Sequence, residues 1–285
     1  MKRVRQALSA FPVHLVIVLI GFVWILPTMG IFVTSFRPRT AISGSGWWTV
    51  FLHPFELAQF TLQNYVQVLN ENNMWHSFLN SLMISIPGTL IPLLLAAFAA
   101  YAFAWMKFPG RDFLLMVVIG LIVVPLQITF IPALRLFVHL GLNGTFFALW
   151  LAHAGYGLPL LVYMLRNFMG GLPSELFESA FIDGASHWTA FVRLVLPLSV
   201  PALASMAIFQ FLWVWNDLLV ALIYVGGSTA TSPVTLTIAN MIGSHGENWQ
   251  LLTAAAFVSI AVPLVVFLSL QRFFVRGILA GSVKG

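Results

Sequence analysis

Apolar residues in this chain are gathered into long runs instead of alternating with polar ones. Most of these runs carry no charged residue over about 20 positions, the length that an α-helix needs to cross the hydrocarbon core of a membrane. Six membrane-spanning helices are therefore predicted, over Phe11–Phe36, Phe78–Met106, Phe113–Leu134, Thr145–Leu165, Leu196–Val225 and Leu251–Leu270.

Composition supports an all-α integral membrane protein. The 285 residues are 60% hydrophobic and only 7% charged, and the mean hydropathy is +0.96. A soluble domain of this size could not bury so many apolar side chains. The chain has no cysteine, which excludes disulfides and thiolate metal ligands, and its histidines match no metal-site spacing. We therefore predict no metal site.

The distribution of positive charge predicts the orientation. Arg37, Arg39 and Arg135 flank one set of span ends. The larger group flanks the ends that share the side of the N-terminus: Lys2, Arg3, Arg5, Lys107, Arg111, Arg166, Arg193, Arg272, Arg276 and Lys284. Cytoplasmic loops carry the excess of Lys and Arg, so both termini are predicted in the cytoplasm. This topology accounts for the net charge of +5, and no nucleic-acid partner is predicted.

Three regions are predicted along the chain. Residues 1–77 form the first span and an external loop, 78–275 form a core of five spans with a polar segment at 170–195, and 276–285 form a short tail. The external loop is rich in aromatic residues that favour a membrane interface, namely Trp47, Trp48, Phe51, Phe55 and Phe60. We expect this loop to pack on the membrane surface.

The polar segment has the marks of a helical hairpin. Pro173 and Ser174 favour a helix start, and an apolar face follows at helical spacing, made of Leu176, Phe177, Ala180 and Phe181. Gly184 suits the left-handed residue that ends a helix, and Ser186 can cap a second short helix. Shape alone leaves open whether this helix lies on lipid or binds another protein.

The residue spacing of this segment resembles one family. Glu178-Ser179-Ala180, then Gly184, then Leu194-Val195-Leu196-Pro197 is similar to the signature of the membrane subunits of ATP-binding-cassette (ABC) importers. Here Ser179 replaces the second residue of the signature and Leu194 replaces an isoleucine. This resemblance implies a type I importer permease fold with six spans and a cytoplasmic coupling helix.

Further stretches resemble the carbohydrate-uptake branch of these permeases. They include Asn64-Tyr65, Asn80-Ser81, Ala100–Ala104, Phe108–Arg111 and Trp215-Asn216. The last residues, Val275–Gly285, resemble the tail of the maltose-type second membrane subunit. Ser35–Arg39 and Gly46–Thr49 resemble α-glucoside members. The implied function is that of a non-catalytic permease subunit for a sugar or oligosaccharide.

The resemblance also implies partners and roles. Two ATP-binding subunits would use ATP and Mg²⁺, because this chain has no Gly-Lys dipeptide and hence no phosphate loop; it is predicted to bind no cofactor. A second, different permease subunit and an extracytoplasmic sugar-binding protein complete the set. The implied ATPase-coupling residues are Glu178, Ser179, Ala180, Asp183, Gly184 and Ala185. The implied binding-protein loop contains Ile242, Gly243, Ser244, Gly246 and Asn248.

Polar and aromatic residues in the fifth predicted span are candidates for the substrate pathway. They are Gln210, Trp213, Asn216 and Asp217. An acid within a span is a functional candidate by default, and aromatic faces beside hydrogen-bonding groups suit sugars. Asp217 could equally cap its helix, and interhelical hydrogen bonding is an alternative role for Gln210.

Two other function classes remain open from the sequence. An ion-coupled secondary transporter would carry coupling carboxylates within its spans, and Asp217 is the one candidate. A membrane scaffold with no transport role would not need the 170–195 segment.

Overall fold

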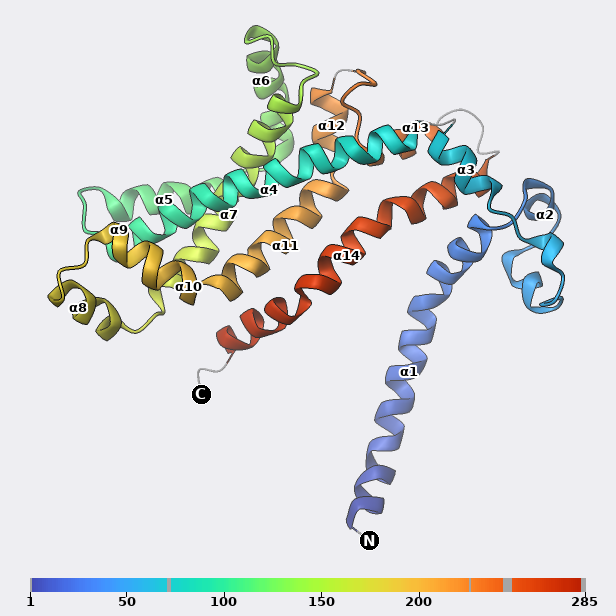
Figure 1. Cartoon of the computed structure of the whole chain (residues 1–285), viewed down its shortest axis with the longest axis horizontal. Coiled ribbons are helices and arrows are strands. Elements are labelled where there is room, and N and C mark those ends of the chain that lie inside the picture. The colour runs from blue at the N-terminus through green and yellow to red at the C-terminus, as the bar shows by residue number, and fades with distance from the viewer. Residues whose placement is uncertain (1, 71–72, 226, 243–247, 283–285) are drawn as a thin grey trace. The chain divides into compact units, whose positions relative to one another are not determined.

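The computed structural model describes residues 2–70, 73–225, 227–242 and 248–282. The described residues form helices and loops and include no strand (Figure 1). The helices are α1 (Lys2–Ser35), α2 (Arg39–Gly44), α3 (Gln63–Asn70), α4 (Met74–Trp105), α5 (Arg111–Ile122), α6 (Leu126–His139), α7 (Phe146–Gly170), α8 (Ser174–Ile182), α9 (His187–Ala190), α10 (Leu196–Leu198), α11 (Val200–Asn216), α12 (Leu219–Tyr224), α13 (Val234–Ile242) and α14 (Trp249–Ser282). Two 3₁₀ turns, η1 (Trp47–Phe51) and η2 (Leu57–Gln59), and a π-helical turn, η3 (Phe191–Val195), join them.

Four described segments are each long and apolar enough to cross a membrane. They are Pro12–Ser35, Met74–Trp105, Phe146–Gly170 and Trp249–Gln271. Two further pairs of helices pass the same test but are bent, α5 with α6 by 101° and His187–Leu198 with α11 by 72°. By length and composition, the described residues therefore contain four candidate spans, or up to six if each bent pair is one span.

Two of the predicted spans are not continuous helices. Phe113–Leu134 is broken between Ile122 and Leu126, where Pro125 has extended backbone and precedes α6. Proline lacks the N–H that an uninterrupted helix requires. Leu196–Val225 is broken at Ser199 and again after Asn216, where α11 ends and Asp217 adopts extended backbone. Hydropathy alone cannot detect such breaks, because the residues on both sides are apolar.

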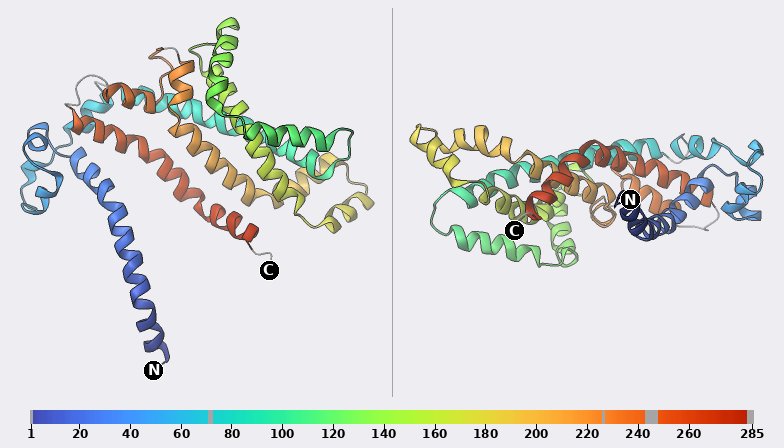
Figure 2. Two further views of the ribbon diagram at one scale, coloured as in Figure 1. Left: turned by 180° about the vertical axis from the view of Figure 1, so that it is seen from behind. Right: turned by 90° about the horizontal axis from the view of Figure 1, so that it is seen from below.

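The chain divides into two compact units. The first contains residues 1–75 and 238–260, and the second contains residues 76–237 and 261–285. Figure 2 shows the helices from two further directions.

The first unit contains a closed loop that follows α1. The Thr61 backbone N–H donates to the Phe36 carbonyl, and the Asn64 amide donates to the Ser35 and Arg37 carbonyls at 2.8 and 2.9 Å. Inside the loop, the buried Arg37 guanidinium donates to the Ala41, Ser45 and Gly46 carbonyls. Burial lowers the pKa of Arg37 from its ordinary value. These bonds fix residues 37–61 as a compact structure, here named the Arg37 loop.

In the second unit, α4, α7 and α11 pack around small residues. Ala96, Ala97 and Ala100 of α4 are buried in one apolar cluster with Leu161 and Leu165 of α7. Small residues let membrane helices approach closely. A second cluster joins α4, α6, α7, α11 and α12. These clusters pack two parts of α4, around Ile84 and from Ala96 to Phe103, against other elements of the unit.

The start of α4 is bound to the segment that leads into α13. The Asn80 amide donates to the Ala230 and Ser232 carbonyls at 2.9 and 3.1 Å, and the Val234 N–H donates to the Ser81 hydroxyl at 2.9 Å. Burying a polar side chain between helices is costly unless it is hydrogen-bonded. Asn80 and Ser81 are tolerated in this apolar helix because both are paired.

Candidate functional site

The polar segment folds as the predicted helical hairpin. Helix α8 ends in a Schellman motif, in which the Ala185 N–H donates to the Ala180 carbonyl and the Gly184 N–H to the Phe181 carbonyl. Gly184 has a φ of +83°, the left-handed conformation expected of it. The Ser186 hydroxyl accepts from the Thr189 N–H at 3.1 Å and caps α9, as predicted. The hairpin is therefore defined by its own sequence.

One face of α4 holds this hairpin. Trp105 stacks on Phe177 of α8, with ring centroids 3.6 Å apart and planes inclined by 18°. The Trp105 indole N–H also donates to the Met169 carbonyl at 2.9 Å. One turn earlier, the Tyr101 hydroxyl lies 3.0 Å from His187 Nδ1. In Figure 1 this end of α4 lies beside α8 and α9.

A third aromatic contact continues the same stripe. Phe98 stacks on Trp188 of α9, with centroids 6.2 Å apart and an interplanar angle of 10°. Positions 98, 101 and 105 share one helical face. These anchoring residues were not among the residues predicted for the hairpin's function. Their aromatic spacing was the available signal, but nothing in the sequence named the partner of that face.

The opposite surface of the hairpin is exposed. Phe177 is buried, whereas Ile182 keeps 85% of its surface accessible and Phe181 keeps 38%. The side chains of Glu175, Glu178 and Asp183 are also exposed. The predicted apolar face is thus divided, because Phe177 packs on α4 while Leu176 and Phe181 remain exposed, at 42% and 38%. This surface combines acidic and apolar groups that are suited to binding another protein.

The predicted substrate-pathway residues fall into two groups. Gln210 and Trp213 line a cavity of about 210 Å³ with Tyr156 and Phe209. Gln210 is buried, and its amide donates to the Gly88 and His153 carbonyls at 3.2 and 3.4 Å. A β-carbon at Gly157 would lie 2.5 Å from that amide, so Gly157 leaves it room.

The other two candidates lie at the end of α11. The Asn216 amide donates to the Leu212 carbonyl of the same helix at 2.8 Å, and Asn216 is exposed. Asp217 Oδ2 accepts from the Val220 N–H at 2.9 Å and caps α12. Neither residue lines the cavity. The structure therefore brings together Gln210 and Trp213 but not all four residues.

The predicted binding-protein loop is only partly described. Gly243, Ser244 and Gly246 lie outside the described residues, whereas Ile242 ends α13 and Asn248 precedes α14. Among the described residues, no group of three His, Asp or Glu side chains is placed to hold a metal ion.

Comparison with known proteins identifies the family. Residues 92–280 match the family described as "Binding-protein-dependent transport system inner membrane component". The chain belongs to this family. The match includes the whole hairpin and the part of α4 that holds it. The chain is thus an inner-membrane component of a transport system that works with a binding protein.

Curated relatives extend the similarity to nearly the whole chain. The osmoprotective compounds uptake permease protein GgtD of Synechocystis sp. is 58% identical over 283 residues, covering 99% of this chain and 95% of the relative. The α-glucoside transport system permease protein AglG of Rhizobium meliloti is 56% identical over 232 residues, covering 80% and 61%. The trehalose/maltose transport system permease protein MalG of Thermococcus litoralis is 33% identical and covers 100% and 98%.

A solved structure supports the fold. A chain of a bacterial ABC transporter involved in importing the acidic polysaccharide alginate matches with a TM-score of 0.66 at 16% identity, covering 96% of this chain and 99% of that one. A second structure of an alginate transporter, in complex with a periplasmic protein that binds an alginate pentasaccharide, also has a TM-score of 0.66. At such identity the likeness concerns the fold alone.

Proposed function

We propose that this chain is the permease subunit of an ABC importer for a sugar or oligosaccharide, with α-glucosides as the favoured class. Two relatives, an α-glucoside transport system permease protein and a trehalose/maltose transport system permease protein, support this substrate class. The chain would form half of the translocation pathway beside a second, different permease subunit. It would have six spans and both termini in the cytoplasm of the plasma (inner) membrane of a prokaryote.

The exposed hairpin carries the proposal. Glu178, Ser179, Ala180, Asp183, Gly184 and Ala185 belong to a helix and turn fixed to α4 by aromatic stacking. The acidic side chains would face basic groups on an ATP-binding subunit, and the exposed Ile182 would enter an apolar part of its groove. Opposite charges in a partly desolvated interface fix register and orientation. The two ATP-binding subunits would use ATP and Mg²⁺, and this chain would contribute no catalytic group.

Because stacked rings attach the hairpin to α4, closure of the ATP-binding subunits could act on the pathway. A push on α8 and α9 would move the stacked Trp105 and Tyr101 and hence α4. The start of α4 is hydrogen-bonded to the segment before α13, which leads toward the proposed binding-protein loop from Ile242 to Asn248. The same helix would therefore convey movement between the two surfaces.

Uptake into vesicles tests the proposal. The chain is reconstituted with its partner permease and ATP-binding subunits, and the nucleotide sites of those subunits face the vesicle lumen. We expect import of a radiolabelled α-glucoside only when ATP is in the lumen and the binding protein is outside the vesicle. An ion-coupled secondary transporter would instead respond to a proton or sodium gradient without ATP. Gradient-driven uptake in the absence of ATP would overturn the assignment.

Cysteine accessibility tests the proposed pathway, because the chain is naturally free of cysteine. We expect Trp213→Cys beside the cavity to react with a water-soluble thiol reagent in a nucleotide-dependent way. Gln210→Cys should react only in a state that opens the contact between α4 and α11, since Gln210 is 1% exposed. Asn216→Cys serves as the exposed comparison. Inertness of Trp213→Cys and Gln210→Cys in every nucleotide state would remove α11 from the pathway.

A further inference from the structure

The Arg37 loop exposes a concentrated apolar surface. Its tip, residues 48–57, presents five large apolar side chains that are 58–94% accessible, namely Trp48, Phe51, Leu52, Phe55 and Leu57. Phe55 is 94% accessible and Leu57 is 80% accessible. Contiguous apolar patches of this kind mark binding surfaces. Trp48 and Phe51 each contact the ring of Trp47 edge to face, yet most of their surface remains accessible.

The loop folds back along a membrane-spanning helix. Trp47 of η1 packs against α1 at Gly30, where an added β-carbon would lie 2.9 Å from the indole nitrogen. Gly30 precedes the end of α1 at Ser35 by five positions, which is about 7.5 Å along the helix axis at 1.5 Å per residue. The start of η1 is therefore level with the last turns of α1.

A cavity between the loop and α1 places the loop at the same height along α1. It has a volume of about 460 Å³ and is lined by Ile42 and Trp47 of the loop together with residues of α1 and α14. The α1 residues are Pro27, Gly30, Ile31 and Thr34. All of these lie within the apolar segment Pro12–Ser35. Trp47 thus contacts α1 inside the segment proposed to cross the membrane, and Ile42 faces the same segment across the cavity.

The length of that segment places the contact near a membrane surface. Pro12–Ser35 has 24 residues and spans about 36 Å as a helix, against a hydrocarbon core of about 30 Å. With this segment centred on the hydrocarbon core, its last residues extend into the headgroup layer, and Gly30 lies within about one helical turn of the boundary with the hydrocarbon. The apolar tip begins at Trp48, directly after the residue that contacts Gly30.

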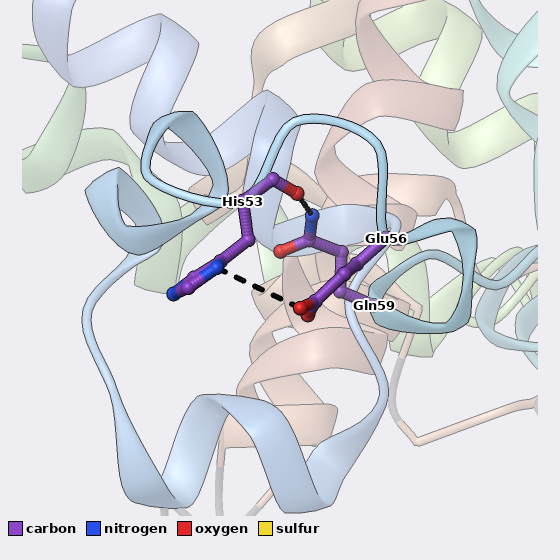
Figure 3. A network of polar contacts seen from close by, with 3 residues as sticks. All are labelled: His53, Glu56 and Gln59. Atoms are coloured by element: carbon purple, nitrogen blue, oxygen red, sulfur yellow. Dashed lines mark hydrogen bonds and ion pairs between the residues drawn. The ribbon is translucent and has the colours of Figure 1, made fainter.

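The low charge of the tip favours a lipid surface over a polar protein surface as its binding partner. Glu56 is the one charged residue between Trp47 and Val66. Its Oε1 lies 3.6 Å from His53 Nδ1, and the Gln59 amide donates to the His53 carbonyl (Figure 3). The polar groups of the tip are thus engaged with one another, and the surface around them is aromatic and aliphatic.

We propose that the tip of the Arg37 loop inserts into the headgroup–acyl boundary of the membrane beside the end of α1. Trp48, Phe51, Leu52, Phe55 and Leu57 bind the lipid surface, as aromatic side chains do at membrane interfaces. The lipid-facing surface continues from α1, whose apolar residues from Val13 to Ile25 are largely accessible. The loop anchors the C-terminal end of α1 to the bilayer.

Fluorescence quenching in the reconstituted complex tests this surface. Phe55→Cys and Leu57→Cys, each labelled with an environment-sensitive fluorophore, are compared with Gln63→Cys at the start of α3, which is also exposed. We expect lipids that carry a nitroxide near the headgroup to quench the two tip labels severalfold more than the Gln63 label. Aqueous iodide should show the reverse order. The tip side chains are so accessible that these variants should fold normally.

Two results would overturn the proposal. Quenching of the tip labels by iodide and not by lipid would make the tip a solvated loop. Protection from both quenchers, with crosslinking from Phe55→Cys to the partner permease or the binding protein, would make it a protein interface. Neither result depends on the transported substrate, so ATP-driven uptake in the same vesicles tests the proposed function separately.

Discussion

Replacing Gly184 with valine is expected to abolish ATP-driven uptake while the chain remains inserted in the membrane. Gly184 adopts a φ of +83° at the end of α8. An L-residue in this conformation costs about 1–2 kcal/mol, and a β-branched side chain is less tolerated still. The variant can relieve the strain only by breaking the Schellman motif, which would turn α8 away from its ATP-binding partner. Uptake and ATPase activity of the purified complex measure the effect.

The surroundings of Gly184 allow a matched control. A β-carbon at this position would meet no atom within 4 Å in the described structure, so the expected loss arises from backbone conformation and not from steric clash. Asparagine tolerates the left-handed region better than other residues do. Gly184→Asn should therefore retain much more uptake than Gly184→Val. Equal uptake by Gly184→Val and the unaltered complex would show that the turn has no part in coupling.

Phe177→Ala is expected to detach the hairpin from α4. Phe177 is 2% exposed and stacked on Trp105. Truncating a buried phenylalanine costs about 3–5 kcal/mol, and the aromatic pair contributes about 0.5–1.5 kcal/mol beyond its buried area. The purified complex should show reduced thermal stability of the hairpin and ATP hydrolysis that no longer responds to the binding protein.

Ile182→Ala separates anchoring from docking. Ile182 lies on the same helix but is 85% exposed, so its truncation should leave the isolated chain as stable as before. If Ile182 enters the ATP-binding subunit, the variant should lose that subunit more readily during purification.

Unchanged stability and binding-protein response in Phe177→Ala would show that stacking on Trp105 does not transmit movement.

Local features of the hairpin were predictable because short-range forces determine them. The left-handed Gly184 and the Ser186 cap each depend on residues within five positions along the chain, and so a single sequence contains the whole cause. The family was predictable for a related reason. The spacing from Glu178 to Pro197 reflects one local structure, and the family match includes it.

The orientation of individual side chains was less predictable. Gln210 and Asp217 were both candidates for the pathway, yet Gln210 lies beside the cavity while Asp217 caps α12. Composition cannot distinguish these cases, since both residues are polar groups in an apolar segment. Asp217 is a capping residue because α11 ends at Asn216 and the Val220 N–H of the next helix then lies within reach of its carboxylate.

Long apolar runs and a local motif are enough to show that the protein is helical, embedded in a membrane and related to importer permeases. The breaks in the predicted spans, the face of α4 that holds the hairpin and the return of the Arg37 loop along α1 became visible only in the folded chain, because these features depend on contacts between distant residues. Trp105 stacks on Phe177 and Trp47 packs on Gly30, and hydropathy along the chain is the same whether or not such pairs meet.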